Sequence, residues 1–404
     1  GVYANVINHC ALSVCFPALA IPMCSGAKLC PVNSEEITYG IPLIPSDKVP
    51  IVDGKTKVLL LRTGEKRQGV VGLFQPGVPG EQSPGLSVRF MGIGRNAIAY
   101  LDNSRTFKVY HEGQITPITD LFTTQFEVSD HLILFRNANS ISVVDGSEIV
   151  NLSRLCDRYA LGDSLVMFYD NYTSTFNSYY KGKITPLESF LALKNTDFTF
   201  DSTVKVSDNI GAYINYNEQF KVFYDNDVET LENQAVNSFD VGRNTVAYVD
   251  INNQFKIFHK GKTYTVDPFA PESYMVGDDV VAFICNDGNF KIFYEGNLYT
   301  IGYYKPRYKV KDRVVAFEDP NGFFKAFYEG EQYQIDSYYP DKYTVSYNSL
   351  VYLNKLNTLR MFSKGKVYDI TSISLQDMRL DYDVLQFKVG YNSIKLFYNG
   401  EYYN

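Results

Sequence analysis

Short apolar stretches alternate with polar turns along most of this chain, and the alternation repeats about every 35 residues. Three consecutive copies show it most clearly: SFDVGRNTVAYVDINNQFKIFHKGKTYTVDPFAPE from Ser238, SYMVGDDVVAFICNDGNFKIFYEGNLYTIGYYKP from Ser273, and RYKVKDRVVAFEDPNGFFKAFYEGEQYQIDSYYPD from Arg307. The apolar residue that precedes the first turn recurs at Ile93, Val128, Leu161, Val206, Val241, Val276, Val310, Val345 and Leu380. The pattern therefore predicts nine units, one of which carries an insertion around Leu191 to Ser202.

Each unit is expected to form four short strands. In the unit from Ser273 these are Tyr274–Val276, Val280–Phe283, Phe290–Tyr294 and Leu298–Ile301. A dipeptide ending in glycine joins the last two strands, and glycine supplies the positive φ that a two-residue hairpin loop requires. The same slot holds Glu112-Gly113, Asp145-Gly146, Lys181-Gly182, Lys260-Gly261, Glu295-Gly296, Glu329-Gly330, Lys364-Gly365 and Asn399-Gly400.

The fold that this repeat predicts is all-β, a β-propeller of about nine four-stranded blades. The strands are apolar on both faces, as in a sheet packed between two others, and a ring leaves only short protected edges. Nine blades exceed the usual number, so an open, solenoid-like array is the alternative. Aromatic residues at equivalent places are expected to form a core layer shared between blades: Tyr100, Tyr213, Tyr248, Phe283, Phe317, Tyr352 and Phe387.

Residues 1–84 do not fit the repeat and are expected to form a small, irregular N-terminal region, with the propeller occupying residues 85–404. Val58–Leu61 and Val70–Phe74 flank a polar turn and read as a hairpin. Four of the six cysteines lie in the first 30 residues, with spacings that do not match a zinc site. They are either a disulfide cluster or small thiols within an apolar segment.

Composition narrows the functional classes. The chain has 33 Tyr and 28 Phe but no Trp, and its formal net charge is -7. Aromatic residues of this kind favour strands. A nucleic-acid-binding protein would show a basic footprint, so that class is disfavoured. We expect no transmembrane segment.

Residues that could carry chemistry recur at repeat positions, which favours structural roles. His111 and His259 occupy a slot that holds tyrosine in other units. Asp102, Asn215, Asp250, Asp319 and Asn354 share one position after the second strand, where Asx side chains bond to the following backbone. Calcium binding is the rival interpretation of these oxygens. A basic residue recurs on the third strand, and it either covers apolar surface or faces an anionic ligand: Lys108, Lys221, Lys256, Lys291, Lys325, Arg360 and Lys395. We therefore expect no catalytic, metal or cofactor site.

Adjacent tyrosines in the connecting loops are the candidate partner-binding residues, namely Tyr303, Tyr304, Tyr338 and Tyr339, with a further pair at Tyr402 and Tyr403. Tyrosine suits protein interfaces because it combines contact area with a polar tip. Stacking on sugar rings and packing between blades are the alternatives.

The FK(I/V)FYxG repeat, seen best at Phe255–Gly261, Phe290–Gly296 and Phe324–Gly330, resembles repeats of uncharacterised exported proteins of Bacteroidota. A propeller-like periplasmic plug subunit of the type 9 secretion translocon is a candidate member of that group. The resemblance implies a periplasmic or extracellular location, in the cell envelope. Together these observations predict a non-enzymatic scaffold that binds a protein partner, with a carbohydrate-binding module or lectin as the alternative.

Overall fold

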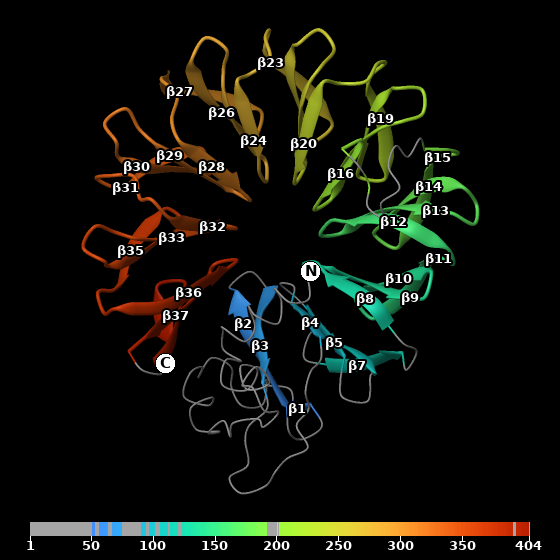
Figure 1. Ribbon diagram of the computed structural model, residues 1–404, viewed down its shortest axis with the longest axis horizontal. Helices are drawn as coiled ribbons and strands as arrows, with labels where there is room; N and C mark the ends of the chain where they lie inside the picture. The colour runs from blue at the N-terminus through green and yellow to red at the C-terminus, as the bar shows by residue number, and fades with distance from the viewer. Residues whose placement is uncertain are drawn as a thin grey trace, which may run out of the picture. The chain divides into compact units, whose positions relative to one another are not determined.

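The computed structural model describes residues 51–52, 56–63, 67–74, 90–93, 97–101, 106–111, 114–119, 123–191, 200, 202–390 and 393–403 (Figure 1). These residues form strands joined by turns. The described residues contain no helix that is long and apolar enough to cross a membrane. The chain falls into two compact units, 1–152 with 373–404, and 153–372.

The first unit contains a three-stranded sheet and three four-stranded sheets. The three-stranded sheet consists of β1 (Ile51–Val52), β2 (Thr56–Thr63) and β3 (Arg67–Phe74). The four-stranded sheets consist of β4 (Phe90–Ile93), β5 (Ala97–Leu101), β6 (Phe107–His111) and β7 (Gln114–Thr119); β8 (Thr123–Val128), β9 (Leu132–Asn137), β10 (Ser140–Asp145) and β11 (Glu148–Ser153); and β36 (Leu375–Asp381), β37 (Val384–Val389), β38 (Ser393–Tyr398) and β39 (Glu401–Tyr403). The pairing of β2 with β3 confirms the predicted hairpin.

The second unit contains six four-stranded sheets in chain order. They consist of β12 (Cys156–Leu161), β13 (Leu165–Asp170), β14 (Thr175–Tyr180) and β15 (Lys183–Glu188); β16 (Val204–Ser207), β17 (Ile210–Ile214), β18 (Phe220–Tyr224) and β19 (Asp227–Glu232); β20 (Ser238–Gly242), β21 (Thr245–Val249), β22 (Phe255–His259) and β23 (Lys262–Asp267); β24 (Ser273–Val276), β25 (Val280–Ile284), β26 (Asn289–Tyr294) and β27 (Asn297–Tyr303); β28 (Tyr308–Lys311), β29 (Val314–Glu318), β30 (Phe324–Tyr328) and β31 (Glu331–Asp336); and β32 (Tyr343–Ser346), β33 (Ser349–Leu353), β34 (Leu359–Ser363) and β35 (Lys366–Thr371).

Each four-stranded sheet is one blade, and its strands are called A to D in chain order. Neighbouring strands pair antiparallel, as in the blade whose strands are β24 to β27. The C–D turn there begins at Glu295 with φ 47° and continues at Gly296 with φ 81°, which matches the positive φ values of a type I′ hairpin. The predicted four-strand unit and its glycine loop are therefore confirmed. Most of the insertion, residues 192–199 and 201, lies outside the described residues.

The predicted strand B aromatic residues of the second unit, Tyr213, Tyr248, Phe283, Phe317 and Tyr352, lie in its core. The first aromatic residue of strand C in one blade packs on the strand B ring of the next, with ring centroids 4.9–5.5 Å apart. The five pairs are Phe176–Tyr213, Phe220–Tyr248, Phe255–Phe283, Phe290–Phe317 and Phe324–Tyr352. All ten rings are buried. Burying a ring of this size contributes roughly 1.5–3 kcal/mol, so the layer stabilises every junction between these blades.

Within the second unit, the A–B turns of neighbouring blades pack backbone against backbone. A Cβ atom on Gly242 would lie 2.0 Å from the Gly277 carbonyl oxygen, and one on Gly277 would lie 2.2 Å from the Asp312 carbonyl oxygen. The Asp278 N–H donates to that same Asp312 oxygen at 2.6 Å. Gly242 and Gly277 have no space for a side chain, because an added Cβ would meet the backbone of the next blade.

Candidate functional site

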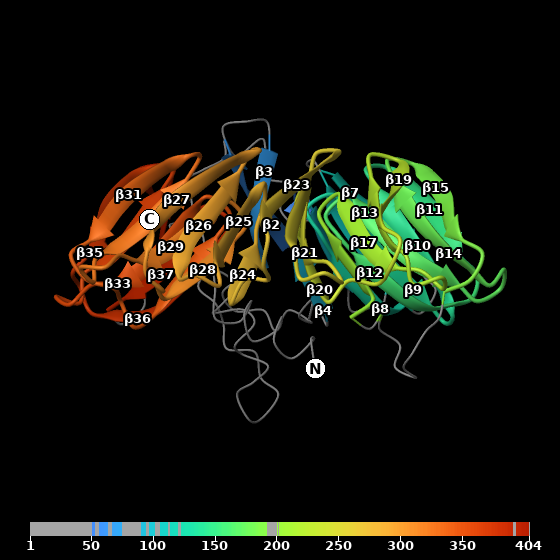
Figure 2. The same ribbon diagram turned by 90° about the horizontal axis from the view of Figure 1, so that it is seen from above.

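Exposed apolar side chains of the second unit gather at one end of the blades. Because strands A to D alternate in direction, the B–C turns and D–A loops share one end, which we call the B–C end (Figures 1 and 2). Twelve large apolar side chains of this unit are exposed, and five of them lie on strands: Ile184, Met275, Leu298, Tyr303 and Val367. Tyr303, the last residue of β27, lies at the B–C end, as do the seven side chains outside strands: Leu155, Tyr172, Phe190, Tyr216, Ile251, Phe269 and Leu356. None of these twelve lies in an A–B or C–D turn.

The B–C turns hold their tips in a fixed conformation. Asp250 Oδ1 accepts the backbone N–H of Asn252 at 2.9 Å and that of Gln254 at 2.8 Å. Asn215, Asp319 and Asn354 make the same two bonds in their own blades. The interpretation of the Asx position as a turn is thereby confirmed for these four residues, whereas Asp102 lies outside the described residues. Oδ1 is directed at backbone donors and not at a space where calcium would bind.

The structure places the four candidate tyrosines in different surroundings. Tyr303 is 78% exposed, at the end of β27. Tyr304 is half-buried against Phe290, with ring centroids 6.2 Å apart. Tyr338 lies beneath the Lys355 ammonium group, 4.4 Å from its ring centroid. Partner binding stays a prediction for all four, and Tyr303 is the one among them that a partner could reach without rearrangement.

Tyr339 belongs to the packing between two blades. Its ring contacts Phe324 at 5.2 Å, its hydroxyl lies 2.6 Å from that of Tyr343, and the Arg307 guanidinium stacks 4.5 Å from its centroid. A ring held on three sides in this way contributes mainly to the junction between the blades of β28–β31 and β32–β35.

In the second unit, basic residues of strand C tie most blades to the one before. Lys256 Nζ lies 2.7 Å from Glu232 Oε1 of the preceding blade and 2.8 Å from Asp250 Oδ2 of its own. Tyr248 donates its hydroxyl to Glu232 at 3.1 Å. Burial, followed by the Glu232 charge, holds the pKa of Tyr248 well above its usual value. The same arrangement recurs in Lys221 and Tyr213 on Glu188, and in Arg360 and Tyr352 on Asp336. These cations neutralise carboxylates of the protein, which supports the structural interpretation of the basic series.

One junction lacks this tie. At the end of β27 the place of the acid is taken by Gly302, and a Cβ there would lie 2.7 Å from the Tyr304 ring. Lys325 bonds instead to Asp319 of its own blade at 3.2 Å, and strand B carries Phe317 in place of tyrosine. Burial, with smaller contributions from Asp319 and Glu318, raises the pKa of Tyr304 to about 12. Tyr304 thus fills the space that an acid occupies elsewhere.

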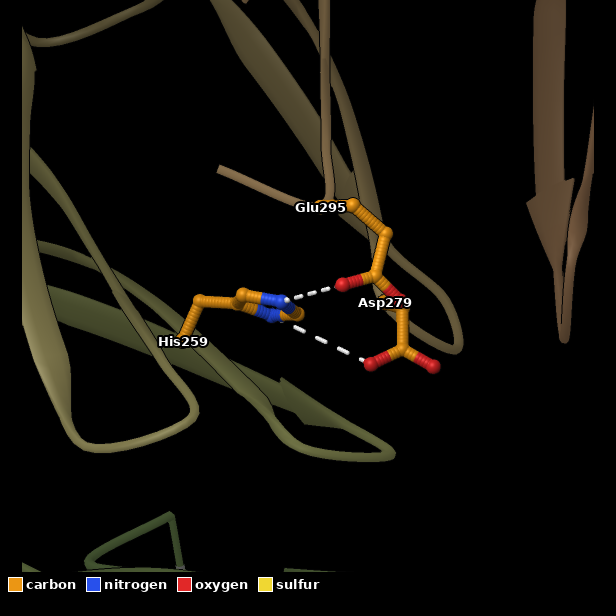
Figure 3. A group of neighbouring side chains, drawn as sticks. All are labelled: His259, Asp279 and Glu295. Atoms are coloured by element: carbon orange, nitrogen blue, oxygen red, sulfur yellow. Dashed lines mark hydrogen bonds and ion pairs between the residues drawn. The ribbon is translucent and has the colours of Figure 1, made fainter. Parts of the chain in front are cut away.

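His259 lies at the junction between the blades of β20–β23 and β24–β27 (Figure 3). Its Nε2 is 3.2 Å from Glu295 Oε2, and its Nδ1 is 4.0 Å from Asp279 Oδ1 and 3.1 Å from Thr245 Oγ1. Lys260 Nζ lies 2.7 Å from both carboxylate oxygens of Glu295. Burial alone would raise the pKa of Glu295, but the hydrogen bonds from Lys260 and His259 outweigh it and hold that pKa below its usual value.

This cluster has the ligand types of a zinc site but the geometry of an ion-pair network. The two ring nitrogens of His259 face different carboxylates, so a single ion could use only one of them (Figure 3). The Lys260 ammonium group already neutralises Glu295. In the blade of β32–β35, Ser349 and Ser363 occupy the positions equivalent to Thr245 and His259, and their hydroxyls lie 2.8 Å apart. We therefore assign His259 to the blade junction, in agreement with its repeat position.

Sequence reasoning missed the acid at the end of strand D. The signal that would have revealed it is the choice between tyrosine and phenylalanine on the next strand B. Where strand D ends in an acid, at Glu188, Glu232 and Asp336, strand B of the next blade carries tyrosine. Where it ends at Gly302, strand B of the next blade carries phenylalanine. The exception is Asp267, which is followed by Phe283 on the next strand B and forms an ion pair with Lys291 at 3.6 Å. Cys285 and Cys156 are buried thiols, and burial chiefly raises the pKa of Cys285 to about 12.

Comparison with known proteins identifies two regions. A family described as a 10-bladed beta propeller domain matches residues 85–403, and a family described as Type 2A encapsulin shell protein SrpI-like matches residues 30–109. Over 68 residues the chain is 75% identical to the Type 2A encapsulin shell protein SrpI of Synechococcus elongatus, covering 17% of this chain and 22% of that protein. It is 61% identical over 97 residues to the shell protein of Mycolicibacterium paratuberculosis, covering 23% of this chain and 32% of that protein. The chain thus spans about a third or less of the length of these curated relatives.

Solved structures resemble the chain only distantly. A computationally designed protein, Ika8, aligns with a TM-score of 0.30 and 14% identity, covering 68% of this chain and 96% of its own. Another is PorZ, a bacterial surface component of the type-IX secretion system of Porphyromonas gingivalis. It aligns with a TM-score of 0.27 and 9% identity, covering 77% of this chain and 51% of its own.

Proposed function

Because the chain belongs to the 10-bladed beta propeller domain family, we propose that it is a non-enzymatic propeller scaffold that binds a protein partner through the B–C end of its blades. The observation that carries the proposal is the gathering of exposed apolar side chains there and their absence from the A–B and C–D turns of the second unit. Large exposed apolar patches mark interaction sites, and two of these side chains, Phe190 and Tyr216, are in ring contact with their centroids 5.2 Å apart.

The chemistry of the B–C end fits a protein surface. Its tips carry Tyr216, Ile251 and Leu356 on turns fixed by Asx hydrogen bonds, and Tyr303 is exposed at the same end. Rigid aromatic and aliphatic groups among Asn and Ser make good protein contacts because little conformational entropy is lost on binding. The strand C cations and the carboxylates between blades form ion pairs with one another, which supports a role in structure and not in catalysis.

We further propose a periplasmic or extracellular location, within an assembly of the cell envelope and with a plug-like role. The resemblance of the FK(I/V)FYxG repeats to those of exported proteins supports this location.

A photo-crosslinking amino acid placed at Leu356 or Ile251 tests the binding surface. Both side chains are exposed at the B–C end, and Leu298 and Val367 on outer strands are control positions whose apolar side chains are also exposed. In cells that make the protein at its natural level, we expect Leu356 and Ile251 to give the same adduct, and the controls to give none. An adduct with an envelope protein supports the location, and a cytosolic partner contradicts it. Adducts at the controls alone, or at no position, would contradict the binding surface.

A second candidate function rests on the match of residues 30–109 to the shell-protein family, and on stretches of 68–97 residues that are 58–77% identical to shell proteins. We propose that this segment attaches the propeller to a protein shell. The full chain, made together with the Synechococcus elongatus shell protein, is expected to sediment with assembled particles. A chain that sediments alone beside intact particles would rule this function out, and would leave the binding surface at the B–C end unaffected.

A further inference from the structure

The A–B turns of consecutive blades in the second unit bring carboxylates together at equivalent positions. The position two residues after the recurring apolar residue of strand A holds Asp208, Arg243, Asp278, Asp312 and Tyr347 in five successive blades. Arg243 stands between two acids in this series, whereas Asp278 and Asp312 are direct neighbours with no cation between them.

Asp278 is enclosed by the turns on either side. Its side chain is buried, and its Oδ1 accepts the Arg243 backbone N–H at 3.4 Å. Its own N–H donates to the Asp312 carbonyl oxygen at 2.6 Å. The Asp312 carboxylate is engaged with the next blade, where it accepts the Tyr347 N–H at 2.7 Å. An ionised Asp278 would therefore lack both water and a close counter-ion.

The charged groups around Asp278 come from every turn packed against it. Asp208 belongs to the β16–β17 turn, Arg243 to the β20–β21 turn, and Asp312 with Arg313 to the β28–β29 turn, beside Asp279 of its own turn. Burial is the largest influence and the Asp208 and Asp312 charges add to it, so the pKa of Asp278 lies well above its ordinary value. The weak contact with Arg243 opposes this without reversing it.

We propose that these A–B turns form a proton-dependent latch, in which the Asp278 carboxyl group takes up a proton as the turns pack and the turns separate more easily once it is lost. A neutral carboxyl group can be buried at far lower cost than an ionised one. The folded state binds this proton more tightly than the unfolded chain does, so its stabilising contribution is full at acid pH. It is lost as the pH rises above the ordinary aspartate range toward the pKa in the folded protein.

Urea unfolding of the full chain and of Asp278→Asn between pH 4.5 and 8 tests the latch. Asparagine keeps the shape of a protonated carboxyl group but cannot ionise. We expect the folded-to-unfolded ratio of the natural chain, relative to Asp278→Asn, to fall by up to about tenfold per pH unit over the titration range. Asp287→Asn is the control, because Asp287 lies in an exposed turn where the Asn289 backbone N–H holds its pKa below the usual value. The folded-to-unfolded ratio of the natural chain, relative to Asp287→Asn, should show no such fall. A ratio that stays constant with pH would overturn the proposal.

Amide hydrogen exchange of residues 277–279 in the natural chain provides a second test that does not depend on the variant folding. After correction for the intrinsic pH dependence of exchange, opening of this turn is expected to be more frequent at pH 8 than at pH 5. Equal opening at both values would overturn the latch.

Discussion

Replacing Gly242 with alanine is expected to lower the free energy of unfolding by about 3 kcal/mol or more. The added methyl group would lie 2.0 Å from the Gly277 carbonyl oxygen and 2.6 Å from its carbonyl carbon. Backbone atoms of a neighbouring blade cannot turn aside as the end of a side chain can. The two A–B turns would have to separate, which would weaken the hydrogen bond from Asp279 N–H to the Arg243 carbonyl oxygen.

The measurement is chemical unfolding of the full chain beside a Gly182→Ala control. Gly182 has a φ of +79° but nothing within 4 Å of an added Cβ, so its replacement costs only the strain of the left-handed conformation, about 1–2 kcal/mol. If Gly242→Ala were no more destabilising than Gly182→Ala, the close packing of the A–B turns would be wrong.

Asp250→Ala is expected to cost about 3–4 kcal/mol, because one buried carboxylate performs two tasks. It accepts two backbone N–H groups of the B–C turn and bonds Lys256, which also bonds Glu232 of the preceding blade. Burial alone would raise the pKa of Asp250, but the bonds from Lys256, Gln254 and Asn252 outweigh it and hold that pKa below its usual value. Its stabilising contribution is therefore present above the aspartate range and lost as the pH falls through it.

Asn354→Ala is the matched control, since Asn354 makes the two turn hydrogen bonds at 2.9 Å but carries no charge. We expect a loss of about 1–2 kcal/mol for this variant, with no dependence on pH. The difference between the two variants measures the ion pair, and it should shrink when unfolding is repeated near pH 3. Equal losses at neutral pH would mean that Lys256 contributes nothing to the junction.

The sequence predicts the blade well because its signals are local. Strand alternation, the C–D glycine and the Asx turn each depend on a few adjacent residues, and the turn at Asp250 forms as expected. The aromatic layer was also predictable, because Tyr248 and its equivalents recur at a position that only a neighbouring blade can cover.

The contacts between blades were harder to predict because their partners lie 16 to 36 residues apart in the chain. Nothing near Lys256 shows that its counter-ion is Glu232. The adjacent tyrosines illustrate the same difficulty: Tyr303 and Tyr304 look equivalent in sequence, yet one is exposed and the other fills the space left by Gly302. Which of two neighbouring rings points inward depends on the side chains that face it from the next blade.

Hydrogen exchange of the protein in its native complex, compared with the purified chain, tests the central claim most directly. The account predicts slower exchange at the B–C turns 215–219, 250–254 and 354–358 in the complex. It also predicts unchanged exchange at the C–D turns that begin at Lys260, Glu295 and Lys364. Protection confined to the C–D turns, or exchange that is the same at both ends, would contradict a protein-binding surface at the B–C end.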